Sequence, residues 1–216
     1  MQLKLFDTAS YKPLNNIDQK VTNLESTIAI ISGLKYVPDF INKKEHEELW
    51  QAIYREPWLT DLKRRVQHYG WKYDYKTRAI DYSMYLGELP DWAQPISERL
   101  YNKGYLPSKP DQLIINEYKP GQGIANHVDC EPCFGDTIVT ISLGARCIMD
   151  FTNVRTKEKI EVLLEPRSLA VISGEARYSW KHGIAARKTD KFIDIKIQRQ
   201  LRISLTFRNV ILNSNA

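Results

Sequence analysis

Hydrophobic and polar side chains alternate most strictly near the C-terminal end, over residues 200–208. The apolar set takes the odd positions: Leu201, Ile203, Leu205 and Phe207. The polar set lies between them: Arg202, Ser204, Thr206 and Arg208. Alternation with a period of two is typical of a strand that turns one face to the core. Apolar runs between turn residues predict further strands over residues 112–118, 136–143, 147–152, 159–164 and 168–173.

Two helices are expected before these strands. Asn42, followed by Glu45 three residues on, has the pattern of a helix N-cap, and this helix should run to about Arg55. A second helix should open near residue 89 and end at Gly104. A first strand is expected near residues 28–37, and a charged loop over 187–196. Two helices followed by many short strands indicate an α+β, mainly β fold: a double-stranded β-helix (jelly roll) with helices packed outside one sheet.

The length of 216 residues fits a single domain, which we expect over residues 28–212, behind a polar N-terminal arm at 1–27. The apolar runs are too short to cross a bilayer, and the first residues lack the pattern of a signal peptide. Three cysteines argue against a disulfide framework, so Cys130 and Cys133 are expected as two free thiols. We therefore expect a cytoplasmic monomer that does not contact membranes.

Charge changes this picture in one segment. The net charge of +5 is modest, but residues 61–80 hold a concentration of basic side chains: Lys63, Arg64, Arg65, Lys72, Lys76 and Arg78. Aromatic rings alternate with them: Tyr69, Trp71, Tyr73 and Tyr75. On a strand these rings would share one face. Cations and stacking rings are typical of nucleic-acid binders, and the alternative is a core sheet face with a charged back.

A candidate metal site lies after a Pro/Gly turn, within a strand–turn–strand pattern over residues 116–129. His127 and Asp129 end the second strand two positions apart, which puts both side chains on one face. One more imidazole would complete the two-histidine, one-carboxylate set that binds iron(II). Of the remaining histidines, His46 falls on a helix expected to be exposed and His68 in the basic segment, so His182 is the best candidate.

The polar face of the last strand suggests a second binding site. Arg202 and Arg208 carry guanidinium groups that bind carboxylates bidentately, and the hydroxyls of Ser204 and Thr206 lie between them. This pattern favours a pocket for a short dicarboxylate. The alternative is an ordinary solvent-exposed sheet face.

Together these motifs resemble a known family. The combination of Asn116-x-Tyr118, His127-x-Asp129, His182 and the two arginines of the last strand resembles the AlkB family of iron(II)- and 2-oxoglutarate-dependent dioxygenases, over about residues 28–210. Segments such as Gln67-His-Tyr-Gly70 and Ile141-Ser-Leu-Gly144 most resemble the AlkB-homologue domain of the tRNA wobble-uridine hydroxylase.

The resemblance implies a role for each matching residue. Iron would be bound by His127, Asp129 and His182. The co-substrate 2-oxoglutarate would be held by Asn116, Tyr118 and Arg202, with Ser204 and Thr206 lining the site. Arg208 would serve catalysis beside Asp129 and the keto-acid end. Substrate would be recognised by Trp71, Tyr73 and Glu131.

The implied activity uses Fe(II), 2-oxoglutarate and O2 to demethylate N-alkylated nucleobases in DNA or RNA, as in the repair of alkylation damage, on a single-stranded or flipped base. Three alternatives stay open: a tRNA wobble-uridine side-chain hydroxylase, a protein demethylase or hydroxylase, and a metal-free binding module of the jelly-roll type.

Overall fold

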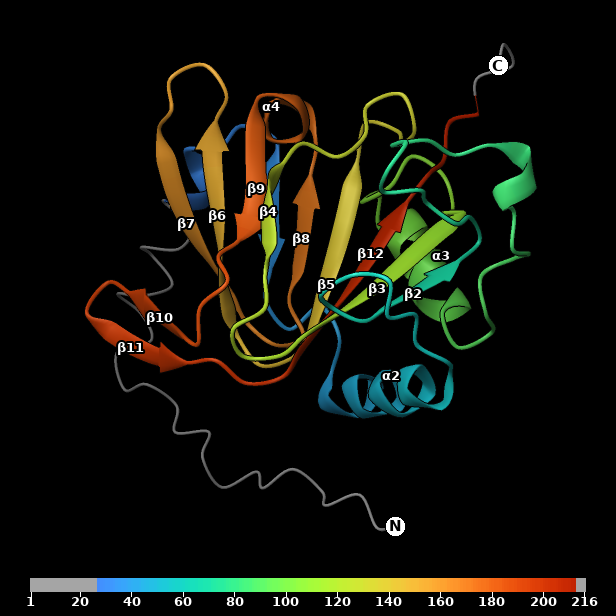
Figure 1. Ribbon diagram of the computed structural model, residues 1–216, viewed down its shortest axis with the longest axis horizontal. Coiled ribbons are helices and arrows are strands. Elements are labelled where there is room, and N and C mark those ends of the chain that lie inside the picture. Colours follow the sequence, from blue (N-terminus) through green and yellow to red (C-terminus); the bar gives the residue numbers. More distant parts are fainter. Residues whose placement is uncertain (1–26, 213–216) are drawn as a thin grey trace.

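The computed structural model describes residues 27–212, and its two larger sheets, both antiparallel, pack face to face (Figure 1). The larger sheet has the strand order β1-β8-β5-β12-β3-β2. Its strands are β1 (Leu34–Val37), β8 (Leu169–Ile172), β5 (Ile138–Gly144), β12 (Arg202–Arg208), β3 (Gln112–Tyr118) and β2 (Val66–Tyr69). The smaller sheet has β4 (Ile124–His127), β9 (Trp180–Ile184), β6 (Cys147–Asn153) and β7 (Lys159–Leu164). This arrangement confirms the predicted jelly roll.

Two hydrophobic cores lie on opposite faces of the larger sheet. One fills the space between the sheets, where Phe151 and Trp180 of the smaller sheet pack with Ile138 and Ile172 of the larger. The other covers the outer face, where α2 (Lys43–Arg55) and α3 (Gln94–Asn102) pack against the strands. The two helices thus lie outside one sheet, as the sequence predicted.

The last strand, β12, lies in the middle of the larger sheet, between β5 and β3. Its apolar side chains Ile203, Leu205 and Phe207 are fully buried in the core beneath the helices. Its polar side chains face the smaller sheet, and Arg202 is only 2% exposed. The alternation was therefore correctly predicted, and the alternative of a solvent-exposed polar face is wrong.

Several element boundaries differ from the prediction. The capping box of Asn42 and Glu45 starts α2 as predicted. The first strand begins only at Leu34, because residues 27–29 are helical. The second helix begins at Gln94, a few residues later than predicted, and Gly104 follows its end with a φ of +69°. The N-terminal arm predicted at 1–27 lies almost wholly outside the described residues.

The segment 187–196 was predicted to be a loop, and this prediction is wrong. It contains most of a hairpin of β10 (Thr189–Phe192) and β11 (Ile195–Gln198). Asp190 is buried at its base and accepts hydrogen bonds from Arg187 Nε at 2.6 Å and Arg199 Nε at 2.7 Å. These ion pairs stabilise the hairpin. The prediction of a loop rested on the charged residues of the segment and overlooked the alternation of Ile195 and Ile197 with polar residues in β11.

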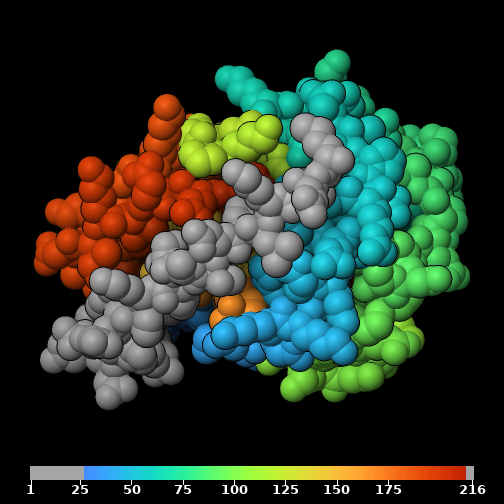
Figure 2. All heavy atoms as spheres, turned by 90° about the horizontal axis from the view of Figure 1, so that it is seen from below, coloured from blue at the N-terminus to red at the C-terminus, as the bar shows by residue number. Residues whose placement is uncertain are grey.

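The hairpin lies across one end of the molecule from α2, and the turn between β3 and β4, in yellow-green, lies between them (Figure 2). This turn is fastened on both sides. The Gly121 N–H donates to the carbonyl oxygen of Arg187 at 3.2 Å, and the Gln122 amide donates to that of Lys63 at 2.6 Å. The strand that leads into the candidate metal site is thereby fixed in place.

The basic and aromatic segment 61–80 does not form one strand. Strand β2 ends at Tyr69, and Gly70 follows with a φ of +75° at a point where a β-carbon would lie 1.8 Å from the Asp111 carbonyl oxygen. Only glycine fits there, so the chain turns. Tyr69 packs on Trp92 beneath the helices, whereas Tyr73, beyond Gly70, packs against the core between the two sheets. The expectation that four rings share one face is wrong.

Cys130 and Cys133 are joined by a disulfide in the turn after β4, where free thiols were expected. Their Cα atoms are 5.3 Å apart, within the range that a disulfide spans. Both sulfur atoms lie 3.2 Å from the carbonyl oxygen of Arg78. The turn brings the two side chains together, which spacing alone did not show. Among residues 27–212, no helix is long and apolar enough to span a membrane.

Candidate metal and co-substrate site

Three potential metal ligands meet at one end of the smaller sheet. His127 on β4 and His182 on β9 are directly paired across the two strands, and their ring centroids are 4.6 Å apart. Strand β4 ends at His127, so Asp129 lies in the segment that follows. The prediction that Asp129 lies on the strand is wrong. One ligand atom from each of these residues nevertheless lies within 4.8 Å of the others. The structure therefore brings together the three side chains that the sequence analysis selected.

The close approach of β4 and β9 depends on Gly183. A β-carbon at this position would lie 2.4 Å from Asn126 Oδ1 and 2.9 Å from the Ile124 carbonyl oxygen. Any larger residue would push the strands apart. Gly183 thus allows the neighbouring His182 to face His127.

The hydrogen bonds of the cluster fit a bound cation. The His127 Nδ1–H donates to the carbonyl oxygen of Ala125 at 2.8 Å, which leaves Nε2 with its lone pair free. Asp129 Oδ1 accepts from Arg208 at 2.9 Å. Asp129 Oδ2 is buried and has no hydrogen-bond partner within the described part of the chain. A buried carboxylate oxygen without a donor is costly unless a cation binds it.

The charges around the cluster favour the protonation states that metal binding requires. Burial opposes ionisation of Asp129, yet the nearby guanidinium of Arg208 and the two imidazoles hold the pKa of this carboxyl well below its usual range. Burial lowers the pKa of His182 to about 4, although Asp129 acts in the opposite direction. At neutral pH the carboxylate is ionised and the His182 imidazole is neutral, as metal ligands must be.

A buried arginine that the sequence analysis did not select supports this turn. Arg177, in α4 (Gly174–Tyr178), is 2% exposed and donates to the carbonyl oxygens of Asp129 at 3.0 Å and Cys130 at 3.2 Å. These bonds fix the backbone around the carboxylate ligand. Neither spacing nor periodicity marks this residue, because its partners lie more than 40 positions away in the chain.

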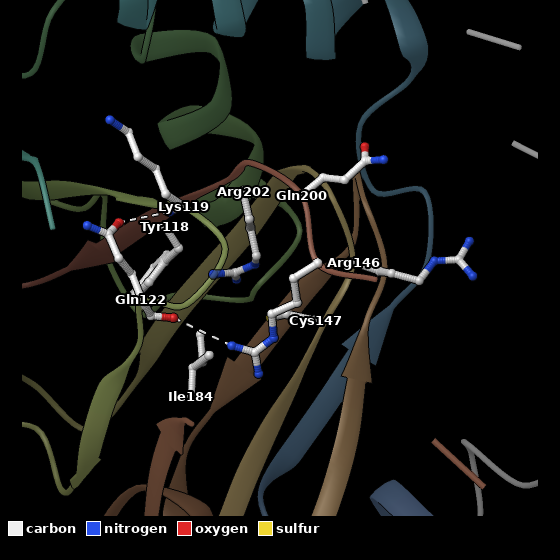
Figure 3. Close-up of a pocket in the computed structure, with 9 residues that line it drawn as sticks. Tyr118, Lys119, Gln122, Arg146, Cys147, Ile184, Gln200 and Arg202 are labelled. Atoms are coloured by element: carbon white, nitrogen blue, oxygen red, sulfur yellow. Dashed lines mark hydrogen bonds between the residues drawn. The ribbon is translucent and has the colours of Figure 1, made fainter. Parts of the chain in front are cut away.

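The polar face of β12 continues from the cluster into a pocket. Arg202 donates from Nη2 to Ser142 Oγ at 2.9 Å, while its Nε and Nη1 are buried and lack a partner among residues 27–212. Figure 3 shows this side chain beside Tyr118, facing the space that Cys147 and Ile184 also border. Unpaired guanidinium donors in a buried pocket fit an anionic ligand.

The other residues predicted for this site join the same face. In the register of the sheet, Ser204 lies opposite Asn116, and Arg202 lies opposite Tyr118. The hydroxyls of Ser204 and Thr206 are 3.4 Å apart, between the two arginines. These side chains therefore form one continuous polar strip from the metal cluster to Arg202.

The residues predicted to recognise substrate are spread more widely. Tyr73 packs on the ring of Phe134, with 5.4 Å between the ring centroids, and the guanidinium carbon of Arg208 lies 4.6 Å from the centroid of the same Phe134 ring. Tyr73 therefore lies near the cluster. Trp71 pairs with the exposed Tyr85, 4.7 Å away, in a separate ring pair. Glu131 is exposed on the turn after Asp129.

Comparison with known proteins agrees with this arrangement. Residues 56–208 match the family described as the 2OG-Fe(II) oxygenase superfamily. The chain is 38% identical over 203 residues to the "Alkylated DNA repair protein ALKBH8 homolog" of Arabidopsis thaliana, which covers 83% of this chain and 59% of that protein. It is 36% identical over 209 residues to the mouse "tRNA (carboxymethyluridine(34)-5-O)-methyltransferase ALKBH8", which covers 84% of this chain and 31% of that protein.

The chain thus spans less than two thirds of the length of these two relatives. Among solved structures, that of OsALKBH1 matches with a TM-score of 0.59 over 82% of this chain and 96% of that chain, at 17% identity, which shows a shared fold. The family implies Fe(II) and 2-oxoglutarate, and the His127–Asp129–His182 cluster could bind a metal ion. The chain is a 2-oxoglutarate-dependent dioxygenase that belongs to the 2OG-Fe(II) oxygenase superfamily and, within it, to the AlkB family.

Proposed function

We propose that this dioxygenase, formed by residues 28–212 as one domain, demethylates N-alkylated bases of DNA or RNA. The observation that carries the proposal is the cluster of His127, Asp129 and His182 at one end of the polar strip, which also contains unpaired guanidinium donors. Such a cluster leaves positions open for a keto acid and oxygen. An organic substrate would then be oxidised beside it.

In this proposal His127, Asp129 and His182 hold iron(II). When iron, 2-oxoglutarate and O2 are bound, they supply the chemistry that inserts one oxygen atom into a C–H bond and converts the keto acid to succinate and carbon dioxide. Arg208 keeps Asp129 ionised and oriented through the 2.9 Å hydrogen bond. Arg177 holds the backbone of the same turn. The protein supplies position and electrostatics rather than a nucleophile.

The keto acid would bind along the polar strip. Arg202 has two unpaired donors for the carboxylate distant from the metal, next to Tyr118. Asn116, Ser204 and Thr206 offer hydrogen bonds along the rest of its length. Guanidinium donors form charge-assisted hydrogen bonds to a carboxylate.

Nucleic acid as the substrate is supported by the segment after β2. The half-buried Trp71 and the exposed Tyr85 form a ring pair, and Lys72, Lys76 and Arg78 of the same segment are exposed. Rings stack on unpaired bases and cations neutralise phosphates. The name of the Arabidopsis relative points to alkylated DNA. Hydroxylation of an N-methyl group gives an unstable product that loses formaldehyde and restores the base.

A mass-spectrometric screen tests this proposal. The protein, iron(II), ascorbate and 2-oxoglutarate are incubated with N-methylated DNA and RNA oligonucleotides and with an anticodon stem-loop. Loss of the mass of one CH2 group from a methylated base is the expected result, and it also identifies the nucleic acid. Succinate formation without any change in a nucleic acid would contradict the substrate class.

A second candidate is hydroxylation of a modified wobble uridine in tRNA. It is favoured by the 36% identity to the mouse relative, whose name refers to uridine 34 of tRNA. The same screen separates the two candidates, because this reaction adds one oxygen atom to the anticodon loop and releases no formaldehyde.

A further inference from the structure

Arg64 lies beside the polar strip, next to Asn116. Its Nε donates to Asn116 Oδ1 at 2.7 Å. Its guanidinium carbon lies 5.8 Å from the ring centroid of Tyr118 and 5.9 Å from that of Tyr75. Both distances allow a cation–π contact. Within residues 27–212, Arg64 forms no ion pair with a carboxylate.

The direction of this side chain follows from the sheet. Val66 on β2 pairs with Asn116 on β3. Successive residues of an extended chain point to opposite faces. Arg65 accordingly reaches the helix side, where it binds Glu117 and covers the Trp58 ring at 4.7 Å. Arg64 reaches the opposite side, which carries the polar strip.

The hydrogen bond from Arg64 determines what Asn116 can offer to a ligand. An asparagine amide has one acceptor oxygen and one donor nitrogen, and a guanidinium can bond only to the oxygen. Asn116 is 7% exposed, and its oxygen is used by Arg64. The nitrogen, with its two N–H groups, therefore remains for the site. A carboxylate needs a donor at that place.

Arg64 also touches the segment proposed to face the nucleic acid. Tyr75 contacts the ring of Tyr73 at 5.0 Å between centroids, and Tyr73 contacts Phe134 at 5.4 Å. Phe134 in turn lies beneath the guanidinium of Arg208. The ring contacts thus connect Arg64 to the same arginine that holds the carboxylate ligand.

We propose that Arg64 is a positioning residue that orients the Asn116 amide toward 2-oxoglutarate and holds the Tyr75 ring against the co-substrate site. The proposal rests on the assignment of 2-oxoglutarate to the polar strip. It predicts that the arginine acts on keto-acid affinity through Asn116 and not through its charge alone.

The test is direct binding of 2-oxoglutarate, measured by calorimetry on the whole chain with Mn(II) in place of iron. Arg64→Met should weaken 2-oxoglutarate binding about tenfold, which corresponds to the loss of roughly one hydrogen bond with a charged donor. Arg64→Lys keeps the positive charge but loses the planar Nε–H, so its affinity should match that of Arg64→Met within about twofold. Lys63→Met is the control, because it removes an exposed charge one position away and should leave affinity unchanged.

A double-mutant cycle separates positioning from a general structural effect. In an Asn116→Ala background, Arg64→Met should change affinity by less than about twofold, because the oriented amide is already absent. An equal loss in both backgrounds would overturn the proposal. So would wild-type affinity in Arg64→Met or in Arg64→Lys. Arg64→Lys carries the test if Arg64→Met does not fold.

The failure of this inference can be told from failure of the proposed function. Wild-type protein that binds no 2-oxoglutarate with Mn(II) would contradict the assignment of the strip itself. Wild-type protein that binds it, with Arg64 variants that bind it equally well, would contradict only the role of Arg64.

Discussion

At the scale of single residues, Arg202 and Arg208 have different partners although they lie on one strand face. Arg208 is committed to Asp129 and to Gln112, whereas Arg202 uses one nitrogen on Ser142 and leaves two donors buried and unpaired. Arg208 therefore serves the metal ligand, and Arg202 has the capacity for a ligand of its own.

Arg202→Met should weaken 2-oxoglutarate binding by about a hundredfold, since it removes charge-assisted hydrogen bonds to a carboxylate. The fold should persist, because methionine fills similar space and Arg202 has a single hydrogen bond within the described chain. Calorimetry with Mn(II) measures the affinity. Arg146→Met is the matched control, because Arg146 lines the same pocket but extends away from it (Figure 3) and pairs with Glu165. Equal losses in both variants would contradict a specific role for Arg202.

His68 gives a second prediction at the residue scale. Burial, together with the nearby charges of Arg208 and Lys72, lowers its pKa to about 4. Between pH 6.5 and 4 the unfolded chain binds a proton that the folded chain does not, so stability is full above pH 6.5 and falls as the pH drops. The loss from this group is at most about 3 kcal/mol.

Denaturant unfolding at a series of pH values measures this effect. His68→Gln should reduce the fall in the free energy of unfolding between pH 7 and 4.5, because glutamine can still accept the Tyr73 N–H and does not titrate. His46 and His182, whose pKa values burial also lowers, remain in the variant and keep part of the slope. An identical pH slope in the two proteins would contradict the assignment.

At the scale of elements, the sequence correctly predicted the helices and strands that have a clear hydrophobic periodicity or a capping motif. The alternation of β12 identified both its core face and its polar face, and the capping box located α2 within one residue. The segment 61–80 was misjudged because a close approach of the backbone at Gly70 ends the strand. The β10–β11 hairpin was missed although Ile195 and Ile197 alternate with polar residues, because the charged residues of the segment were taken as the sign of a loop.

The disulfide in the turn after β4 leads to a prediction about thiol reactivity. Cys130 and Cys133 are joined and Cys147 is buried as a free thiol. Thiol titration should therefore detect no reactive group in the native protein, one after unfolding, and all three cysteines after unfolding with reductant. Detection of three thiols in the unfolded protein without reductant would show that the disulfide is absent.

At the scale of the whole molecule, the site exists because the two sheets pack face to face. The smaller sheet supplies His127 and His182, the turn beyond it supplies Asp129, and the larger sheet supplies the arginines. The sequence motifs and the family resemblance selected these residues correctly as neighbours. They did not reveal Arg64 or Arg177, because the partners of these residues are set by the packing of segments far apart in the chain.

The most direct test of the central claim is iron binding and turnover in the wild type and in Asp129→Ala. The wild type should bind one iron(II) per chain and form succinate in the presence of its nucleic-acid substrate. Asp129→Ala, checked for folding by circular dichroism, should lose both, because the variant lacks the one carboxylate of the cluster. A folded Asp129→Ala variant with undiminished iron binding and turnover would contradict the account.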